Sequence, residues 1–403
     1  MGVDADPMKR PEQAVILCGG LGTRLRPYTD HLPKPMIPCN GKPFLEYLLE
    51  QLAEKGIRRF LLLTGYLGEQ IQQYFGNGTQ QGWEIDYSHG PAEWDTGRRL
   101  WEAQDQMDAR YLLLYSDNFV PFPLEKVLLQ HERHGLPLTF TVSPKSPGNL
   151  VLDEEGIVQH YDNQRGEDQP FVEIGYMVAE RDRVLPWLPK PDCSFSEVLR
   201  DMGSQQKISA WVQLDAYHSI SDPDRWKAAE RYLQPKKILL LDRDGVINEK
   251  AAKGEYVNCW EEFRWIERTR DSLRQLSKMG FRFIVISNQA GIARGMTSPE
   301  EVERIHRKMV ETLAAEGIEI LQVYVCPHHW EDNCDCRKPK PGMLFQASRD
   351  HLFRLDRTVF VGDDPRDLEA AEQAGCRGVL WEDSPKFIDW HKLVSDPPKT
   401  QQF

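Results

Sequence analysis

Two loops, each directly following a short apolar run, constrain the fold of this chain most strongly. The first apolar run is Ala14–Leu17, followed by Cys18-Gly19-Gly20-Leu21-Gly22. The second is Ile238–Leu241, followed by Asp242-Arg243-Asp244-Gly245. Short continuous apolar runs are typical of strands buried in parallel sheets, and α/β proteins bind phosphorylated ligands in the loops that follow such strands. The sequence therefore predicts two phosphate sites, each on its own strand end.

The alternation of apolar and amphipathic segments starts twice. It runs from Gln13 to about Leu233 and begins again at Ile238, after the short connection Gln234-Pro235-Lys236-Lys237. Alternating strands and helices predict a doubly wound α/β fold, with a mostly parallel sheet and helices on both faces. At 403 residues the chain also exceeds what one hydrophobic core usually organises. We therefore predict two α/β domains, over residues 12–234 and 236–390.

The second half carries a clear set of expected elements. The predicted strands cover 238–241, 281–287, 323–326 and 358–361, and the predicted helices cover 269–279 and 299–316. This order favours a second doubly wound domain without a separate cap.

Composition excludes several classes of function. The net charge of −12 argues against a nucleic-acid surface, because binding to a phosphate backbone needs clustered Lys and Arg. No apolar run approaches the roughly 20 residues that cross a bilayer. The first residues, Met1 to Pro11, lack the apolar segment of a signal peptide, so a cytoplasmic protein without a membrane or nucleic-acid partner is expected.

The first loop has the composition of a triphosphate site. Gly19, Gly20 and Gly22 can bring backbone N–H groups onto phosphate oxygens, because glycine offers no side-chain obstruction. Arg24 and Lys34 are expected to neutralise the triphosphate and the leaving pyrophosphate. A lone Gly-Gly-x-Gly could equally be a tight turn, but here Thr23-Arg24-Leu25-Arg26-Pro27 and Pro33-Lys34-Pro35 continue the pattern.

From Gly19 to Met36 the chain resembles the sugar-1-phosphate nucleotidyltransferases, and the resemblance extends over about residues 13–233. It implies that a sugar 1-phosphate and a nucleoside triphosphate give a nucleotide sugar and pyrophosphate. It also implies that Thr23 belongs to the substrate site and that Asp117, at the end of Leu112–Ser116, holds Mg²⁺.

The chain departs from that family in its sugar site. Ser219 stands where the family commonly has a second metal-binding aspartate, and a hydroxyl is a poor ligand for magnesium. The usual Glu-Lys-Pro is replaced by a stretch without lysine, residues 160–165. The segment that forms one wall of the sugar site in the family has the sequence Glu173-Ile174-Gly175-Tyr176 in this chain, which makes Glu173 the candidate sugar ligand. Triphosphate binding is expected to be retained and sugar handling to be altered.

The second loop has the composition of a phosphatase site. Asp242 and Asp244 are two residues apart, which places both carboxylates on one side of an extended chain, so one can attack phosphorus while the other transfers a proton. We expect both, with Asp363, to be Mg²⁺ ligands. Lys338 is expected to screen the developing charge. Ser287 and Asn288 are expected to bind the phosphoryl group.

Over residues 236–385 the chain resembles the haloacid-dehalogenase-like phosphohydrolases. The segments 242–248, 287–295 and 337–343 look like the capless heptose-1,7-bisphosphate 7-phosphatase branch. This resemblance implies that Arg294 and Arg337 meet the far end of the substrate.

A metal site is expected between these segments. Of the eight cysteines, three cluster with a histidine, at Cys326, His328, Cys334 and Cys336, and the others are scattered singly. Three thiolates and one imidazole match a closed, structural zinc site, although the spacing alone does not exclude iron. The five residues between His328 and Cys334 make a loop closer in length to that of the histidinol phosphatases, which leaves the substrate open.

Joining the two resemblances predicts a bifunctional enzyme. The phosphatase would remove the 7-phosphate of D-glycero-D-manno-heptose 1,7-bisphosphate, and the transferase would join the remaining 1-phosphate to a nucleotide, with GTP as the expected donor. Two alternatives stay open. One is a phosphatase for a histidinol-phosphate-like ester beside a transferase for another sugar. The other is a first domain that only senses or binds nucleotide.

Overall fold

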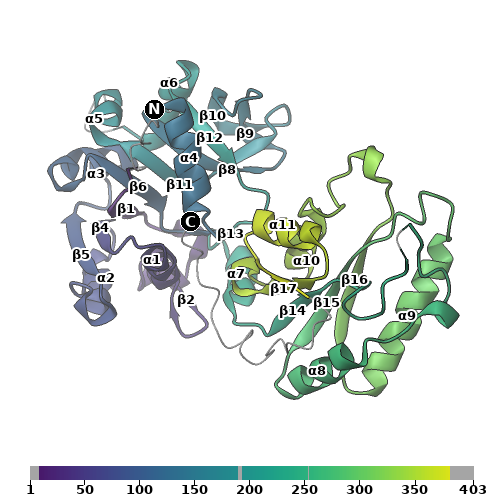
Figure 1. Ribbon diagram of the computed structural model, residues 1–403. Coiled ribbons are helices and arrows are strands. Elements are labelled where there is room, and N and C mark those ends of the chain that lie inside the picture. The colour runs from purple at the N-terminus through teal and green to yellow at the C-terminus, as the bar shows by residue number, and fades with distance from the viewer. Residues whose placement is uncertain (1–8, 189–192, 253, 382–403) are drawn as a thin grey trace, which may run out of the picture. The chain divides into compact units, whose positions relative to one another are not determined.

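The computed structural model describes residues 9–188, 193–252 and 254–381 (Figure 1). The chain folds into two compact units, the first ending at Leu233 and the second beginning at Gln234. Each unit is a mixed α/β fold, which confirms the predicted fold class. Residues 382–390 of the predicted second domain lie outside the described residues.

The first unit is built on a mixed sheet. Its strands in the described part of the chain are β1 (Gln13–Cys18), β4 (Arg59–Thr64), β5 (Glu84–His89), β6 (Arg110–Tyr115), β8 (Leu138–Pro144), β9 (Gly148–Leu152), β10 (Val158–Gly166), β11 (Phe171–Glu180) and β12 (Ile208–Val212). Strands β6, β1, β4 and β5 are parallel neighbours, whereas β11 runs antiparallel to β6. Antiparallel strands need no helical crossover, and β9 and β10 follow each other directly. The mostly parallel arrangement predicted from the sequence therefore holds for the half that carries the glycine-rich loop.

Helices cover this sheet. They are α1 (Phe44–Glu54), α2 (Gly68–Phe75), α3 (Thr96–Glu102), α4 (Leu124–His134), α5 (Arg181–Val184), α6 (Phe195–Ser204) and α7 (Pro223–Leu233). Val15 of β1 belongs to one buried core with Leu100 of α3 and Phe195 of α6. Helix α6 starts at a capping box in which Ser194 and Glu197 satisfy free backbone N–H groups. Two short ladders, β2 (Pro38–Cys39) with β3 (Lys42–Pro43) and β7 (Asn118–Phe119) with β13 (His218–Ser219), lie outside the main sheet.

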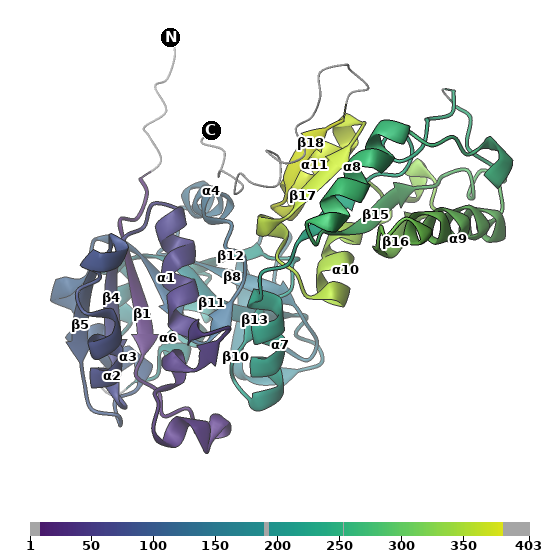
Figure 2. The same cartoon turned by 90° about the horizontal axis from the view of Figure 1, so that it is seen from below.

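The second unit is a parallel sheet between two pairs of helices (Figure 2). The strand order is β16-β15-β14-β17-β18, and the bounds are β14 (Ile238–Leu241), β15 (Arg282–Asn288), β16 (Ile320–Cys326), β17 (Val359–Gly362) and β18 (Arg377–Leu380). The helices are α8 (Glu267–Lys278), α9 (Pro299–Ala315), α10 (Gly342–His351) and α11 (Pro365–Ala374). Leu239 and Leu241 pack with α8 and α9, while Ile238 and Leu240 pack with α10 and α11. Side chains alternate along the strand, so a continuous apolar run buries both of its faces.

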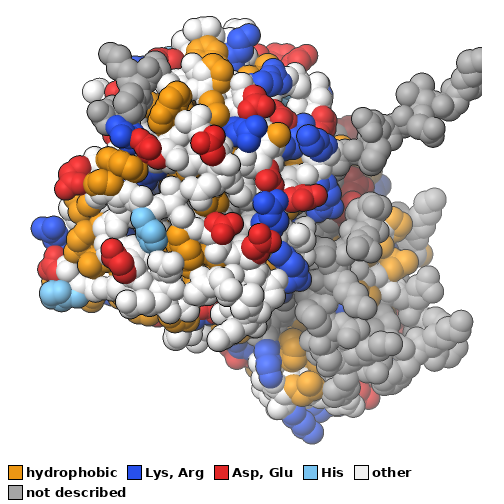
Figure 3. All heavy atoms as spheres, turned by 90° about the vertical axis from the view of Figure 1, so that its left-hand side faces the viewer, with side chains coloured by type: hydrophobic (Ala, Val, Ile, Leu, Met, Phe, Trp, Pro, Cys, Tyr) orange, Lys and Arg blue, Asp and Glu red, His pale blue; other side chains and the backbone are white. Residues whose placement is uncertain are grey.

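Within the described ranges, no helix combines the length and the apolar character that crossing a membrane takes. On the face of the first unit that Figure 3 shows, acidic and basic side chains are interspersed. Neither sign of charge dominates that face.

Candidate active sites and a candidate metal centre

The predicted site of the first unit lies at the carboxyl ends of two neighbouring strands. Strand β1 ends just before Gly19, and β6 ends two residues before Asp117. Because β1 and β6 pair in parallel, these ends meet at one edge of the sheet. The Ser116 hydroxyl donates to the Leu17 carbonyl at 2.6 Å and joins the two segments. The structure therefore brings the glycine-rich loop and Asp117 together.

Lys34 also reaches this edge. Its Nζ lies 2.5 Å from Oδ2 of Asp117, and both side chains are largely shielded from solvent. Gly22 has φ +64, and a Cβ there would lie 3.1 Å from Cβ of Lys34, so glycine allows the loop to pack against this lysine. Gly20, Thr23 and Arg24 are exposed on the same loop. The loop thus presents backbone and basic groups to solvent at the sheet edge.

A buried arginine that the sequence did not reveal supports the loop from behind. Arg99 of α3 is only 4% exposed. Its guanidinium donates to the carbonyls of Thr64 and Pro91, both at 2.7 Å, and to that of Gly19 at 3.4 Å. A Cβ on Gly19 would lie 2.2 Å from Cζ of Arg99. All three acceptors are neutral main-chain groups, so the positive charge behind the loop is not cancelled by them.

Replacing Arg99 with methionine is expected to raise the KM for nucleoside triphosphate about 10-fold or more, because the loop loses hydrogen bonds from a charged group. Arg98→Met, the adjacent position on α3, serves as the control. Steady-state pyrophosphate release measures both variants. Equal KM values for the two would contradict this role of Arg99.

Ser219 and Glu173 flank Asp117 from other strands. The ladder between β13 and β7 places Ser219 opposite Asn118, and the Ile220 N–H donates to the Asp117 carbonyl at 2.9 Å. Ser219 therefore lies beside Asp117, where the resemblance expects a second carboxylate. Glu173 on β11 accepts a hydrogen bond from the Gly175 N–H, and burial raises the pKa of its carboxyl to about 8. A buried carboxyl on this wall suits recognition of a hydroxyl-bearing ligand.

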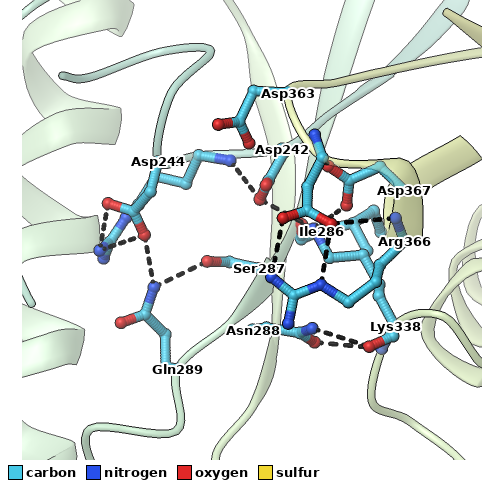
Figure 4. A network of polar contacts seen from close by, with 12 residues as sticks. Asp242, Asp244, Ile286, Ser287, Asn288, Gln289, Lys338, Asp363, Arg366 and Asp367 are labelled. Atoms are coloured by element: carbon cyan, nitrogen blue, oxygen red, sulfur yellow. Dashed lines mark hydrogen bonds and ion pairs between the residues drawn. The ribbon is translucent and has the colours of Figure 1, made fainter. Parts of the chain in front are cut away.

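The predicted site of the second unit has the same construction. Asp242 follows β14 and Asp363 follows β17, and these strands are parallel neighbours. Lys338 is 2% exposed, and its Nζ lies 2.9 Å from Asp242 and 2.7 Å from Asp367 (Figure 4). The same nitrogen donates to the Ile286 carbonyl at 2.9 Å. All three ammonium hydrogens thus have acceptors, which fixes the charge between the two carboxylates.

Three carboxylates converge beside this lysine. Oxygen atoms of Asp242, Asp363 and Asp367 all lie within 4.8 Å of one another. Burial raises the pKa of Asp242, although the charge of Lys338 opposes this shift. Burial also raises the pKa of Asp363. Oδ1 of Asp363 is buried without a hydrogen-bond partner, while Oδ2 accepts from the half-exposed Lys250 at 2.6 Å. Excess negative charge and a free carboxylate oxygen fit a hard cation such as Mg²⁺.

Asp244 does not join this group. Its Oδ1 accepts from Arg243 at 2.8 Å and from Asn248 at 2.9 Å, and its Oδ2 accepts from Arg243 at 2.8 Å and from Gln289 at 2.9 Å. Burial alone would raise the pKa of Asp244, but the charge and hydrogen bonds of Arg243 hold it below its ordinary value. The chain turns directly after Asp244, with φ +88 at Gly245, so the extended geometry assumed from the sequence does not apply. The structure brings Asp367 into the group of carboxylates and holds Asp244 apart from it.

Ser287 and Asn288 lie at the end of β15 but make different contacts. The Ser287 hydroxyl accepts from the Gln289 amide at 2.8 Å. The Asn288 amide exchanges two hydrogen bonds with the backbone of Lys338, each 3.1 Å long. Asn288 therefore orients the segment that carries the lysine. The expected contact of its side chain with a phosphoryl group stays a prediction.

The four expected zinc ligands converge. The Sγ of Cys326 lies 3.7 Å from that of Cys334, and Cys334 lies 3.5 Å from Cys336. Nδ1 of His328 lies 3.6 Å from Cys326 and 3.2 Å from Cys336. A tetrahedral zinc with bonds of about 2.3 Å to sulfur separates its ligands by roughly 3.7 Å. The donor set and its spacing therefore fit zinc.

The two predicted substrate arginines contact this metal loop. The exposed guanidinium of Arg294 lies 5.7 Å from the ring centres of both Tyr256 and Trp330. Arg337 donates to the His328 carbonyl at 3.3 Å. Both arginines are thus connected to the cysteine and histidine loop within the second unit.

Comparisons with known proteins match each unit separately. The family model described as nucleotidyl transferase matches residues 13–164, and the one described as polynucleotide kinase 3 phosphatase matches residues 237–374. A D-glycero-beta-D-manno-heptose-1,7-bisphosphate 7-phosphatase of Pseudomonas putida is 42% identical over 144 residues, which cover 36% of this chain and 81% of that protein.

Two solved structures are similar in part. The D,D-heptose 1,7-bisphosphate phosphatase of B. bronchiseptica, complexed with magnesium and phosphate, is 35% identical and covers 36% of this chain and 79% of its own, with a TM-score of 0.34. HddC of Yersinia pseudotuberculosis is 21% identical and covers 54% of this chain and 98% of its own, with a TM-score of 0.48.

Asp242 and Asp363 follow neighbouring strands, and the buried Lys338 contacts Asp242, all within the unit that is 42% identical to the P. putida enzyme. The glycine-rich loop and Asp117 of the first unit lie within residues 13–164, which the nucleotidyl transferase model matches. The chain belongs through its second unit to the haloacid-dehalogenase-like heptose-1,7-bisphosphate 7-phosphatase family, and its first unit is a nucleotidyltransferase domain.

Proposed function

We propose that this chain is a bifunctional enzyme of nucleotide-activated heptose synthesis. The second unit removes the 7-phosphate of D-glycero-D-manno-heptose 1,7-bisphosphate, and the first unit joins the remaining 1-phosphate to a nucleotide. The observation that carries the proposal is the buried Lys338 between Asp242 and Asp367, on a unit 42% identical to a heptose bisphosphate phosphatase. The two reactions fit together because the phosphatase reaction leaves intact the 1-phosphate that the transferase reaction needs.

In the phosphatase reaction Asp242 is the proposed nucleophile. An oxygen of its carboxylate attacks the phosphorus, the bond from phosphorus to the sugar oxygen breaks, and Asp244 gives the leaving oxygen a proton. Water then attacks the aspartyl phosphate, Asp244 takes a proton from this water, and Asp242 is regenerated with release of inorganic phosphate. Lys338 stabilises the negative charge throughout. Mg²⁺, for which Asp242 and Asp363 are the proposed ligands, would offset the repulsion between carboxylate and phosphate. Asp367 then serves chiefly to hold Lys338.

In the transferase reaction no covalent intermediate is needed. The backbone N–H groups of the loop from Gly19 to Gly22 would hold the triphosphate, and Thr23, Arg24 and Lys34 lie at its side. An oxygen of the sugar 1-phosphate attacks the α-phosphorus, and the bond to the leaving pyrophosphate breaks. Asp117 is the proposed ligand of a second Mg²⁺, and Glu173 is the proposed sugar ligand. We propose GTP as the donor.

Cys326, His328, Cys334 and Cys336 are proposed to hold a structural zinc. A closed site with four protein ligands leaves no position for substrate, so its role is to fix the loop that contacts Arg294 and Arg337. Two long loop arginines lose less conformational entropy on binding when their neighbours are already ordered.

Replacing Cys334 with serine is expected to abolish zinc binding and to lower the unfolding temperature of the second unit by roughly 5 °C or more, because metal binding contributes to folding free energy. Cys259→Ser removes a cysteine outside the cluster and serves as the control. Elemental analysis and differential scanning calorimetry provide the measurements. Iron in place of zinc, or full zinc content in Cys334→Ser, would contradict the assignment.

A rate comparison tests the substrate. The purified chain, with Mg²⁺, is given heptose 1,7-bisphosphate and histidinol phosphate, and released phosphate is measured. A kcat/KM at least about 100-fold higher for the bisphosphate is expected, since Arg294 and Arg337 would bind its second phosphate. Preference for histidinol phosphate would overturn the proposal.

One observation favours a second candidate function for the first unit. Ser219 occupies the place beside Asp117 where a second carboxylate is expected, so a metal there has fewer anionic ligands. A unit that binds nucleotide without turning it over would act as a sensor. Nucleotide binding in calorimetry, without pyrophosphate release from any sugar phosphate, would favour that function.

A further inference from the structure

A buried chain of polar contacts leads from helix α9 to Asp244. His306 of α9 is 7% exposed, and Arg243 is 1% exposed. Nη1 of Arg243 donates to Nε2 of His306 at 2.9 Å, while Nη2 donates to both oxygens of Asp244 at 2.8 Å. Because separate nitrogens of one rigid, planar group bind the two partners, His306 and Asp244 together determine how the guanidinium is oriented.

His306 can only act here as an acceptor. A ring nitrogen that accepts carries no hydrogen, so the imidazole is neutral and its proton is on Nδ1. Burial and the neighbouring charge of Arg243 lower the pKa of His306 to about 3, so the ring stays neutral across the working pH range. A neutral acceptor binds Arg243 without cancelling its charge, which leaves that charge for Asp244.

Arg243 depends on this acceptor. Its Nε is buried without a hydrogen-bond partner. If His306 lost its acceptor nitrogen, Nη1 would also be unpaired inside the unit, at a cost that favours rotation of the guanidinium. Asp244 would then lose the donor that contacts both of its oxygens, and only Asn248 and Gln289 would still hold it.

We propose that His306 is a positioning residue for Asp244, acting through Arg243. The inference rests on the proposed function, in which Asp244 gives a proton to the leaving sugar oxygen. Among the described residues, Arg243, Asn248 and Gln289 donate to the two Asp244 oxygens, and Arg243 contacts both of them. The orientation set by Arg243 therefore decides whether the Asp244 carboxyl group faces the leaving oxygen.

A comparison of leaving groups separates positioning from general damage to the fold. A sugar alkoxide must be protonated as it leaves, whereas p-nitrophenolate leaves without a proton, so only the sugar ester needs the acid. kcat/KM reports the steps up to release of the leaving group, and therefore excludes the later attack of water. The ratio of kcat/KM for heptose 1,7-bisphosphate to that for p-nitrophenyl phosphate is the quantity to measure.

His306→Leu is expected to lower this ratio about 10- to 100-fold, because removing a general acid altogether costs roughly 10²- to 10⁴-fold. His306→Gln retains an acceptor at a similar reach and is expected to keep the ratio within about 3-fold of the wild type. His351→Leu, which removes another histidine of the same unit, is the control and should leave the ratio unchanged. The groove beside His306 is lined by Val302, Val310 and other apolar groups, so leucine is compatible with folding there.

Each outcome of this comparison either supports or overturns the proposed role of His306. A selective loss in His306→Leu with rescue in His306→Gln supports the inference, whereas an equal loss on both esters, or none, overturns it. If His306→Leu does not fold, Arg243→Lys replaces it, because lysine lacks the planar pair of separate nitrogens with which Arg243 binds His306 and both oxygens of Asp244, and the same selective loss is expected. Asp244→Asn separates the two proposals: without a selective loss there, the general-acid role itself fails, whatever His306 does.

Discussion

Asp242→Asn is expected to reduce phosphate release at least about 10⁴-fold and to leave pyrophosphate release within about 2-fold of the wild type. An amide is a very poor nucleophile toward phosphorus. It would also leave Lys338 with one carboxylate fewer. The two proposed active sites lie on separate units with their own cores, so damage to one should not reach the other.

The matched control for this prediction is Asp271→Asn, which removes an exposed carboxylate from α8 of the same unit. Released phosphate is measured with heptose 1,7-bisphosphate, and pyrophosphate with a supplied sugar 1-phosphate. Phosphate release above about 1% of the wild type would contradict the assignment of the nucleophile. Loss of both activities would contradict the independence of the two sites.

Asp117→Ala is expected to lower pyrophosphate release on the order of 10³-fold while phosphate release stays unchanged. Two consequences of the change act together. The proposed metal loses a protein carboxylate, and with Ser219 beside it no second carboxylate on that ladder takes its place. Lys34 also loses its ion-pair partner and is free to bind a phosphate oxygen, so nucleotide binding should weaken less than turnover.

Asp86→Ala on β5 is the control for Asp117→Ala, because it removes an exposed carboxylate from the same sheet. The readouts are kcat for pyrophosphate release and the Kd of the nucleotide by calorimetry. A nucleotide Kd that rises as much as kcat falls would show that Asp117 serves binding alone. An unchanged kcat would remove Asp117 from the mechanism.

The sequence predicted those parts of the sites that are encoded locally. A continuous apolar run followed by a loop signals a buried parallel strand and its functional end, and this pattern correctly placed β1, β14 and β17 with the loops that follow them. The cysteine and histidine cluster is also local, so its convergence follows from spacing within one loop. The strand ends and the cysteine and histidine cluster both depend little on contacts between distant residues.

The parts that the sequence did not predict depend on contacts between distant residues. From the sequence alone, Arg99 is indistinguishable from a surface residue of a helix. Only the packing of α3 in the folded unit places it behind Gly19. Asp367 lies in the first turn of α11, where an acidic residue is ordinarily explained by the helix dipole, and its contact with Lys338 needs the folded unit. The separation of Asp244 from the other carboxylates depends on the turn at Gly245.

The elements that were not predicted are short or carry a weak pattern. Strand β18 (Arg377–Leu380) is four residues long and partly exposed at the edge of its sheet. Helix α10 follows a proline-rich segment, and α11 buries mostly alanines, so neither shows a strong apolar stripe. The antiparallel half of the first sheet was missed because adjacent strands without an intervening helix interrupt the α/β alternation.

The most direct test of the account is a reaction in which heptose 1,7-bisphosphate, GTP and Mg²⁺ are incubated with the wild-type chain, while phosphate and pyrophosphate are followed separately. We predict that phosphate appears first and that pyrophosphate follows after a lag, with formation of GDP-heptose. Asp242→Asn is expected to release almost no phosphate under any condition and to release pyrophosphate only when heptose 1-phosphate is supplied. ATP, CTP and UTP in parallel reactions identify the base. Pyrophosphate release from the bisphosphate by Asp242→Asn, or none by the wild type even with heptose 1-phosphate and all four nucleotides, would contradict a two-step enzyme.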